Sequence, residues 1–233
     1  MTKKKLSIII PVFNEEKTIS QVLEKVLQFN LQDKEVIVIN DGSTDSTKKI
    51  LNDNFSDKKD LIILNNEKNR GKGFAVREGI NVSTGEIILI QDADTEYDPN
   101  DFKILLDPIN KGYAEVVYGS RFIGSNPHRV MYFANRIANS FLTFFSNLLT
   151  NLNLTDMETG YKVFNKKLLN NFELKENDFG FEPELTIKLA KTKCRFYEVG
   201  ISYKGRTYEE GKKIRAIDFF KAIIVLIRYK FFK

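Results

Sequence analysis

The stretch Glu86-Ile87-Ile88-Leu89-Ile90-Gln91-Asp92-Ala93-Asp94 is a short apolar segment that ends on two carboxylates one residue apart. A run of this kind is typical of a buried β-strand. Residues i and i+2 of an extended chain point the same way, so Asp92 and Asp94 can converge on one hard cation just beyond the strand. A divalent ion held there would suit a diphosphate ligand. An ordinary solvated turn explains the same residues, so the rest of the chain has to decide.

Strand and helix patterns alternate on both sides of this stretch through the first 120 residues. The expected strands cover residues 6–12, 36–39, 61–64, 87–90 and 115–118. Between the first two, Ile19, Val22, Leu23, Val26 and Leu27 recur at helical spacing and form one apolar face. This alternation predicts an α/β fold with a mostly parallel central sheet and helices on its faces.

Composition limits the classes of protein. A chain of 233 residues fits one domain, residues 1–233, and its hydrophobic 42% is spread over short runs, which predicts no membrane-spanning helix. Residues 1–5 lead straight into the first strand, so we expect synthesis and residence in the cytoplasm. With one cysteine, Cys194, and one histidine, His128, neither a disulfide framework nor a zinc cluster is expected. The chemistry must use carboxylates, Arg and Lys.

The net charge of +5 favours anionic partners: a nucleotide, a lipid phosphate or a membrane surface. The basic residues form no dominant helical stripe and accompany no stacking motif, so we expect no nucleic acid partner.

Two helical stretches, at about residues 129–149 and 216–232, are rich in aromatic residues. Met131, Tyr132, Phe133, Phe141 and Phe144 belong to the first, and Arg136, Asn139 and Ser146 interrupt it. Aromatic and aliphatic residues mixed with Lys and Arg suit amphipathic helices that lie at a bilayer surface. Helices that pack on the sheet would show the same composition.

Polar residues follow three of the expected strands. They are Pro11-Val12-Phe13-Asn14-Glu15, Asn40-Asp41-Gly42-Ser43 and Gln91-Asp92-Ala93-Asp94-Thr95-Glu96. In open α/β sheets, ligands bind outside the carboxyl ends of the strands. The acidic residues that follow these three strands would lie at one edge of the sheet, and they repel one another unless a cation or a donor-rich ligand lies between them. Dinucleotide and P-loop phosphate motifs do not fit, because Val76 stands where the first needs a small residue and residues 205–213 have the wrong spacing for the second.

Four motifs in the first half resemble, in order, those of family 2 glycosyltransferases. They are Pro11-Val12-Phe13-Asn14-Glu15, Asn40-Asp41-Gly42-Ser43-Thr44-Asp45, Asn69-Arg70-Gly71-Lys72-Gly73 and Asp92-Ala93-Asp94. Three later motifs are similar to the dolichol-phosphate mannose synthase branch. They are Tyr118-Gly119-Ser120-Arg121-Phe122, Asp156-Met157-Glu158-Thr159-Gly160-Tyr161-Lys162 and Gly205-Arg206-Thr207-Tyr208-Glu209-Glu210-Gly211-Lys212-Lys213.

This resemblance implies a GT-A fold in which residues 1–120 bind a nucleotide sugar and residues 121–233 bind the acceptor. It places the donor between the first and second strand exits, the Asp-Ala-Asp motif and the Gly205–Lys213 segment, which we expect to close as a loop over it. The implied donor-binding residues are Pro11, Phe13, Glu15, Ile39, Asp41, Asp92, Ala93, Asp94, Arg206 and Lys212. Asp92 and Asp94, with Glu96, would hold Mg²⁺ or Mn²⁺ against the diphosphate.

The same resemblance implies a phosphate acceptor. Its oxygen is already anionic and needs no strong base, but it needs a cationic cradle to overcome repulsion between two phosphate-bearing substrates. We expect this cradle to be Arg121, Arg129 and Arg136. Asp156 and Glu158 lie where hydroxyl-glycosylating relatives keep their base, and we expect Asp156 to orient the acceptor site instead. The implied catalytic residues are Asp94, Arg121, Arg206 and Lys212.

These observations predict an inverting, metal-dependent glycosyltransferase, peripheral on the cytoplasmic face of a membrane. It would move a hexose from a donor of the GDP-mannose or UDP-glucose type to a dolichyl or undecaprenyl phosphate. Two alternatives are a family 2 enzyme that acts on a hydroxyl of a glycan or lipid, and a non-catalytic nucleotide-sugar-binding protein. The motifs do not distinguish the base, the sugar, the preferred metal or the oligomeric state.

Overall fold

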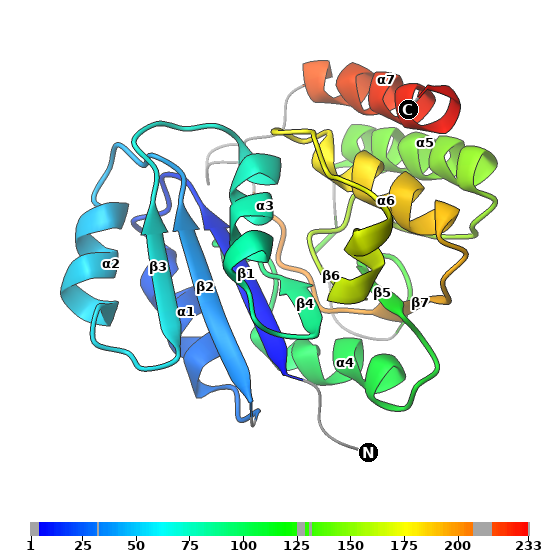
Figure 1. Ribbon diagram of the computed structural model, residues 1–233. Helices are drawn as coiled ribbons and strands as arrows, with labels where there is room; N and C mark the ends of the chain where they lie inside the picture. Colours follow the sequence, from blue (N-terminus) through cyan, green and yellow to red (C-terminus); the bar gives the residue numbers. More distant parts are fainter. Residues whose placement is uncertain (1–4, 32, 125–128, 131, 207–215, 233) are drawn as a thin grey trace.

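A computed structural model describes residues 5–31, 33–124, 129–130, 132–206 and 216–232, and for residues 216 and 217 the backbone only (Figure 1). Within these residues, a seven-stranded sheet has the order β3-β2-β1-β4-β6-β5-β7. The strands are β1 (Leu6–Val12), β2 (Lys34–Asn40), β3 (Leu61–Asn65), β4 (Ile87–Ile90), β5 (Val116–Ser120), β6 (Lys162–Asn165) and β7 (Phe196–Gly200).

The five strands expected from the sequence are confirmed, two of them, β1 and β4, at the expected bounds. The apolar runs of β1, β2, β4 and β5 are buried because helices cover both faces of the sheet, as is usual for parallel strands, whereas the edge strand β3 is partly exposed. The expected α/β class with a mostly parallel sheet is therefore confirmed.

Strands β6 and β7 were not among the five expected strands, and β6 changes the direction of strand pairing. Strand β6 has four residues and lies antiparallel between β4 and β5, whereas the pairs β1–β2, β2–β3, β1–β4 and β5–β7 are parallel. Through β6, one sheet includes strands from both the 1–120 and the 121–233 regions.

Helices form a layer on each face of the sheet. Helices α1 (Ile19–Gln28), α2 (Thr47–Phe55) and α4 (Phe102–Asn110) contribute to one apolar core. Helices α3 (Lys72–Val82), α5 (Phe133–Thr150), α6 (Phe181–Lys191) and α7 (Ala216–Phe231) contribute to the other. Short 3₁₀ turns are η1 (Pro99–Asp101) and η2 (Lys166–Asn171).

The two aromatic stretches form α5 and α7, which lie side by side at the upper right of Figure 1. Helix α5 begins at Phe133 rather than near residue 129, and it ends at Thr150, where Asn151 adopts a left-handed conformation with φ 59°. No helix in the described part of the chain is long and apolar enough to cross a membrane.

The strand order creates a switch point between β1 and β4. From β1 the chain builds β2 and β3 on one side, and it then returns through α3 to place β4 on the other side of β1. Crevices at such points are the usual ligand sites of open α/β sheets. The exits of β1 and β4 therefore meet where the sequence places its carboxylates.

Candidate active site

Four carboxylates, which we call the acidic edge, follow the carboxyl ends of β1 and β4: Glu15, Asp92, Asp94 and Glu96. Thr18, just before α1, connects the two exits. Its hydroxyl lies 2.8 Å from Glu15 Oε2 and 3.0 Å from the carbonyl oxygen of Ala93. The structure therefore brings together the acidic residues expected from two strand exits far apart in the sequence.

Arg206 reaches the acidic edge from the second half of the chain. Its Nη2 lies 2.6 Å from Asp94 Oδ2, and its Nη1 lies 3.2 Å from both carboxylate oxygens of Glu15. Its Nε is 3.6 Å from Glu96 Oε1. Lys212, the other expected cation, lies outside the described residues.

Lys72, the first residue of α3, lies on the other side of the acidic edge. Its Nζ is 2.7 Å from Asp92 Oδ1 and 2.9 Å from Glu182 Oε1, which belongs to α6. Burial opposes a charge on Lys72, but Asp92 and Glu182 outweigh it and raise the pKa of this amine well above its ordinary value. Lys72 is therefore a cation that joins α3, α6 and the end of β4.

Crowded negative charge distinguishes Asp94. Burial, together with the nearby carboxylates Asp92 and Glu96, raises the pKa of Asp94 to about 7, although Arg206 acts in the opposite direction. A site where carboxylates raise one another's pKa is one that an added cation stabilises.

The acidic edge meets some, but not all, of the requirements of the expected divalent metal site. Asp92 and Asp94 supply two hard oxygen ligands, and Mg²⁺ is usually bound by one or two carboxylates with phosphates and water. However, Asp92 pairs with Lys72, Asp94 pairs with Arg206, and Glu96 accepts hydrogen bonds from the backbone N–H of Arg206 and the hydroxyl of Tyr203. Within the described ranges, no group of three or more His, Cys, Asp or Glu is arranged to hold a metal.

The other residues expected to bind the donor differ in their surroundings. Asp41 is buried, and its carboxylate accepts hydrogen bonds from the backbone N–H groups of Arg70 and Gly71, at 2.9 and 2.7 Å, and from the amide of Asn66 at 3.0 Å. It thus fixes the loop before α3.

Pro11 and Phe13 are partly buried at the end of β1. The side chains of Ile39 and Ala93 are buried in the core, which leaves their backbone for contact with a ligand.

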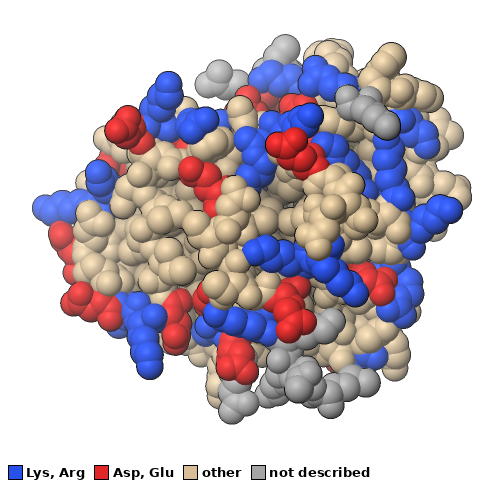
Figure 2. Space-filling view, in the orientation of Figure 1, with Lys and Arg blue, Asp and Glu red and all other residues tan. Residues whose placement is uncertain are grey.

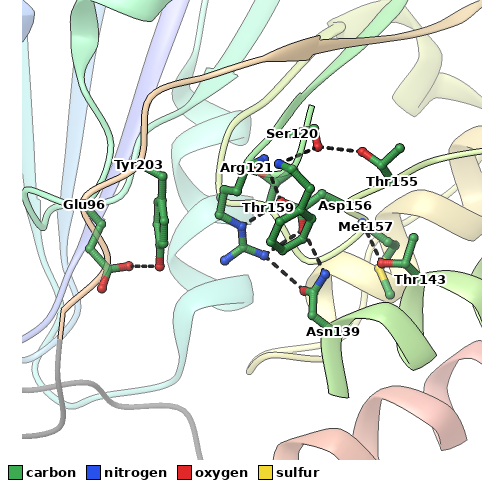
Figure 3. Close-up of polar contacts among 12 residues, drawn as sticks. Glu96, Ser120, Arg121, Asn139, Thr143, Thr155, Asp156, Met157, Thr159 and Tyr203 are labelled. Atoms are coloured by element: carbon green, nitrogen blue, oxygen red, sulfur yellow. Dashed lines mark hydrogen bonds and ion pairs between the residues drawn. The ribbon is translucent and has the colours of Figure 1, made fainter. Parts of the chain in front are cut away.

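Arg121, just after β5, is the centre of a second polar cluster, shown in Figure 3. Its Nε and Nη2 donate to the two oxygens of Asp156 at 2.6 and 2.7 Å, and Nη2 also donates to Asn139 Oδ1 at 3.1 Å. Asp156 is fully buried. The Tyr203 ring lies 5.2 Å from the Arg121 guanidinium carbon, between this cluster and Glu96 (Figure 3).

The other two expected acceptor arginines are placed differently. Arg136, on α5, stacks on the Phe122 ring at 3.4 Å, and the guanidinium of Arg121 lies 5.4 Å from the same ring. Arg129 donates from Nη1 to the carbonyl oxygen of Gly205 at 3.0 Å, and its backbone N–H donates to that of Tyr203. Arg121 and Arg136 thus share one aromatic ring, whereas Arg129 contacts the segment that carries Arg206.

Three residues of these clusters carried no role in the sequence analysis: Lys72, Tyr203 and Glu182. Lys72 stood in Gly71-Lys72-Gly73, where its position before a helix after a strand was the available signal. Tyr203 had none, because its neighbours Glu96 and Arg121 are 107 and 82 positions away in the sequence. Glu182 lies in the first turn of α6, and its contact with Lys72 on α3 joins parts of the chain that are far apart in the sequence.

The structure has the arrangement that the motifs led us to expect of a glycosyltransferase: a mostly parallel sheet, an acidic edge at its switch point and arginines beside that edge. Comparison with family models agrees: residues 7–172 match the model described as glycosyl transferase family 2. The chain belongs to this family and is a glycosyltransferase, as the sequence motifs predicted.

Two relatives match nearly the whole chain. A UDP-N-acetylglucosamine–dolichyl-phosphate N-acetylglucosaminyltransferase of Methanococcus voltae is 27% identical over 99% of this chain and 98% of its own length. A dolichyl-phosphate beta-glucosyltransferase of Trichomonas vaginalis is 25% identical over 97% of this chain and 73% of its own length.

The fold is also that of a solved structure. Glucosyl-3-phosphoglycerate synthase from Mycobacterium tuberculosis, in complex with Mn²⁺, uridine diphosphate and phosphoglyceric acid, superposes with a TM-score of 0.71. The match covers 99% of this chain and 80% of that one, at 18% identity, and it establishes the similarity of fold.

Proposed function

We propose that this glycosyltransferase moves one hexose from a nucleotide diphosphate sugar to a polyprenyl phosphate, with inversion and with a divalent metal ion. Residues 1–120 would form the donor half and residues 121–233 the acceptor half. The two relatives whose names specify dolichyl phosphate, and which align over nearly all of this chain, support the choice of acceptor.

The observation that carries the proposal is the two-sided nature of α5. On one side, Asn139 of this helix hydrogen-bonds Arg121. On the other, a stripe of apolar side chains is at least half exposed: Phe133, Ile137, Phe141, Phe144 and Leu148. One helix thus connects a buried cationic centre to an exposed apolar surface, which is the arrangement that a phosphate with a long apolar tail requires.

On the donor side, Asp92 and Asp94 would hold Mg²⁺ or Mn²⁺. The ion, when bound, neutralises charge on the diphosphate. Arg206 would stabilise the negative charge that develops on the departing diphosphate, and this assistance is worth most in a partly buried site where the guanidinium is already placed. We assign Lys212 the same role by its motif. Lys72 would keep Asp92 in position.

On the acceptor side, Arg121 and Arg136 would attract the phosphate, with Arg129 near the Arg206 segment. The anionic phosphate oxygen would attack the anomeric carbon opposite the leaving diphosphate, which inverts that carbon. Asp156 is buried and bonded to Arg121, so it orients the arginine and is not free to act as a base. This favours a phosphate acceptor over the hydroxyl acceptor considered above.

The exposed stripe of α5 continues onto α7, where Phe220, Ile224 and Phe231 are at least half exposed. Contact between Phe141 and Phe219, with ring centroids 5.7 Å apart, joins the two helices. Figure 2 shows Lys and Arg side chains over this region at the upper right, among them residues of α7. Apolar and cationic groups together support peripheral binding to an anionic bilayer, at the cytoplasmic face.

A transfer assay tests the proposal. The protein is incubated with Mn²⁺, a panel of labelled nucleotide sugars and polyprenyl phosphate, with unphosphorylated polyprenol as the matched control. We expect an acid-labile labelled lipid with the phosphate, none with the alcohol, and none with the Asp94→Ala variant. No labelled lipid with any donor, or equal labelling of the alcohol, would contradict a phosphate acceptor.

A further inference from the structure

Glu96 shares the guanidinium of Arg206 with Asp94, since Glu96 Oε1 lies 3.6 Å from Arg206 Nε. It also accepts hydrogen bonds from uncharged groups of that part of the chain. Its Oε1 accepts the backbone N–H of Arg206 at 2.7 Å, and its Oε2 accepts the Tyr203 hydroxyl at 2.8 Å. Its backbone carbonyl accepts the N–H of Lys204 at 2.9 Å. Three contacts thus fasten one residue to the 203–206 segment.

A metal ion can replace the present partners of Asp92 and Asp94 far more easily than the present partners of Glu96. A divalent ion that binds Asp92 or Asp94 replaces one positive charge, on Lys72 or Arg206, by another. A divalent ion that drew Glu96 away would instead leave a backbone N–H and a phenol without acceptors, in surroundings where the Glu96 side chain is only 14% exposed. Unpaired buried donors carry the full cost of desolvation.

The 203–206 segment connects the two sides of the site. The guanidinium of its last residue, Arg206, donates hydrogen bonds to Asp94 and Glu15. The ring of its first residue, Tyr203, lies 5.2 Å from the Arg121 guanidinium carbon (Figure 3). The same ring lies 5.4 Å from the ring of Tyr97. The residue that fixes this segment therefore sets the position of Arg206 with respect to both substrates.

We propose that Glu96 is a positioning residue, which fastens the 203–206 segment so that Arg206 faces the donor diphosphate, and that it is not a metal ligand. This inference rests on the proposed function, because it takes Asp92 and Asp94 as the metal ligands and the diphosphate as the partner of Arg206. It departs from the role of third ligand that the family resemblance implied for Glu96.

Binding measurements separate the two roles without any transfer assay. Binding of Mn²⁺ alone is followed by the loss of the free-ion EPR signal, and binding of UDP and of GDP in the presence of Mn²⁺ is followed by calorimetry. We expect Glu96→Ala to leave the Kd for Mn²⁺ within about threefold of wild type and to weaken nucleotide binding about tenfold, and we expect the same loss of nucleotide affinity in Arg206→Met. Tyr203→Phe, which removes one of the contacts, should show a smaller loss of nucleotide affinity.

Three controls make the outcome decisive. Glu96→Gln keeps an acceptor for the Arg206 N–H and should restore nucleotide binding to within about threefold of wild type. Asp94→Ala should lose Mn²⁺ binding, and Glu24→Ala, which removes an exposed carboxylate on α1, should change neither Kd. Thermal unfolding of each variant verifies that it is folded.

Loss of Mn²⁺ binding in Glu96→Ala to the extent seen in Asp94→Ala would overturn the positioning role. So would unchanged nucleotide affinity in a folded Glu96→Ala protein. Failure of the wild-type protein to bind any nucleotide with Mn²⁺ would instead overturn the proposed function, and the comparison of variants shows which of the two ideas has failed.

Discussion

Gly160 lies directly against Asp92. A Cβ built on this glycine would come 2.2 Å from Asp92 Oδ2 and 2.9 Å from the Tyr97 ring. The backbone N–H of Gly160 also donates to the Tyr97 hydroxyl at 2.8 Å. The absence of a side chain at this position therefore leaves the space that Asp92 occupies at the acidic edge.

We predict that Gly160→Ala weakens Mn²⁺-dependent nucleotide binding by about tenfold or more, because the new methyl group displaces the Asp92 carboxylate. Calorimetry measures the effect. Gly180→Ala is the matched control, since its new Cβ would also be crowded, but by side-chain atoms of Val225 and Glu176, at 3.0 and 3.1 Å, and not by a carboxylate of the acidic edge. Equal nucleotide affinities in the two variants would argue against a role for Asp92.

Glu35 illustrates a carboxylate used for stability at the opposite, amino-terminal end of the sheet. Burial alone would raise its pKa, but hydrogen bonds from Ser7, from Thr84 and from Lys5 outweigh burial and lower the pKa to about 2. Because the folded pKa is below the unfolded value, ionised Glu35 stabilises the fold at neutral pH. This stability is lost as the pH falls through about 4.5 toward 2.

The corresponding prediction concerns the pH dependence of unfolding. At pH 7, Glu35→Gln should lower the free energy of unfolding by about 2 kcal/mol, as expected for charge-assisted hydrogen bonds. The difference from wild type should shrink steadily from about pH 4.5 toward pH 2, because over this range the unfolded chain gains a proton at Glu35 while the folded protein keeps the carboxylate ionised. Chemical denaturation at a series of pH values measures this, and a difference that stays constant down to pH 3 would contradict the assignment.

At the scale of elements, α5 and α7 each pack against the core with one face and expose apolar side chains on the other. Ala222, Val225, Leu226 and Tyr229 of α7 are buried against the core, so removal of this helix would expose apolar surface and confuse any test of membrane binding. Substitutions on the exposed stripe avoid this difficulty.

We predict that Phe144→Ser with Leu148→Ser lowers the fraction of protein that sediments with anionic vesicles by about tenfold, because two large apolar contacts with lipid are lost. Binding of nucleotide with Mn²⁺ should not change. Val82→Ser, on α3, is the control, since Val82 is 40% exposed and lies outside the stripe. Equal sedimentation of the double variant and wild type would remove the membrane assignment for α5.

At the scale of the whole molecule, one sheet positions the residues that we propose to bind the donor and the acceptor. Strand β4 presents Asp92 and Asp94, strand β5 presents Arg121, and β6 joins them in antiparallel pairing. Donor binding and acceptor binding should therefore be separable by substitution even though their residues share one frame.

Arg136 provides the test of that separation, because it is partly buried, stacks on Phe122 and, among the residues that the structure describes, forms no ion pair with the acidic edge. Arg136→Gln should raise the KM for the lipid phosphate about tenfold while the Kd for nucleotide with Mn²⁺ stays within about twofold. Arg228→Gln, which removes an arginine of α7 paired with Glu176, is the control for a lost surface charge. A weakened nucleotide Kd in Arg136→Gln would place this arginine on the donor side instead.

Local sequence signals predicted the part of the molecule that depends on local chemistry. Glu15, Asp92 and Asp94 could be predicted because each follows the end of an apolar run, and because the carboxyl ends of parallel strands lie at the same edge of a sheet. The signals were weaker for β6, whose four residues are stabilised by neighbours on both sides, and absent for the pairing of Glu96 with Tyr203. Contacts between residues so far apart depend on how the chain folds back, which periodicity and spacing do not encode.

The most direct test of the central claim is a crystal structure with Mn²⁺ and a sugar nucleotide, read by anomalous scattering from manganese. We predict one manganese peak within coordination distance of Asp92 and Asp94, next to the diphosphate, with Arg206 near the phosphate oxygens. An ordered nucleotide with no manganese at these two carboxylates, or a nucleotide bound away from the β1–β4 switch point, would contradict the account.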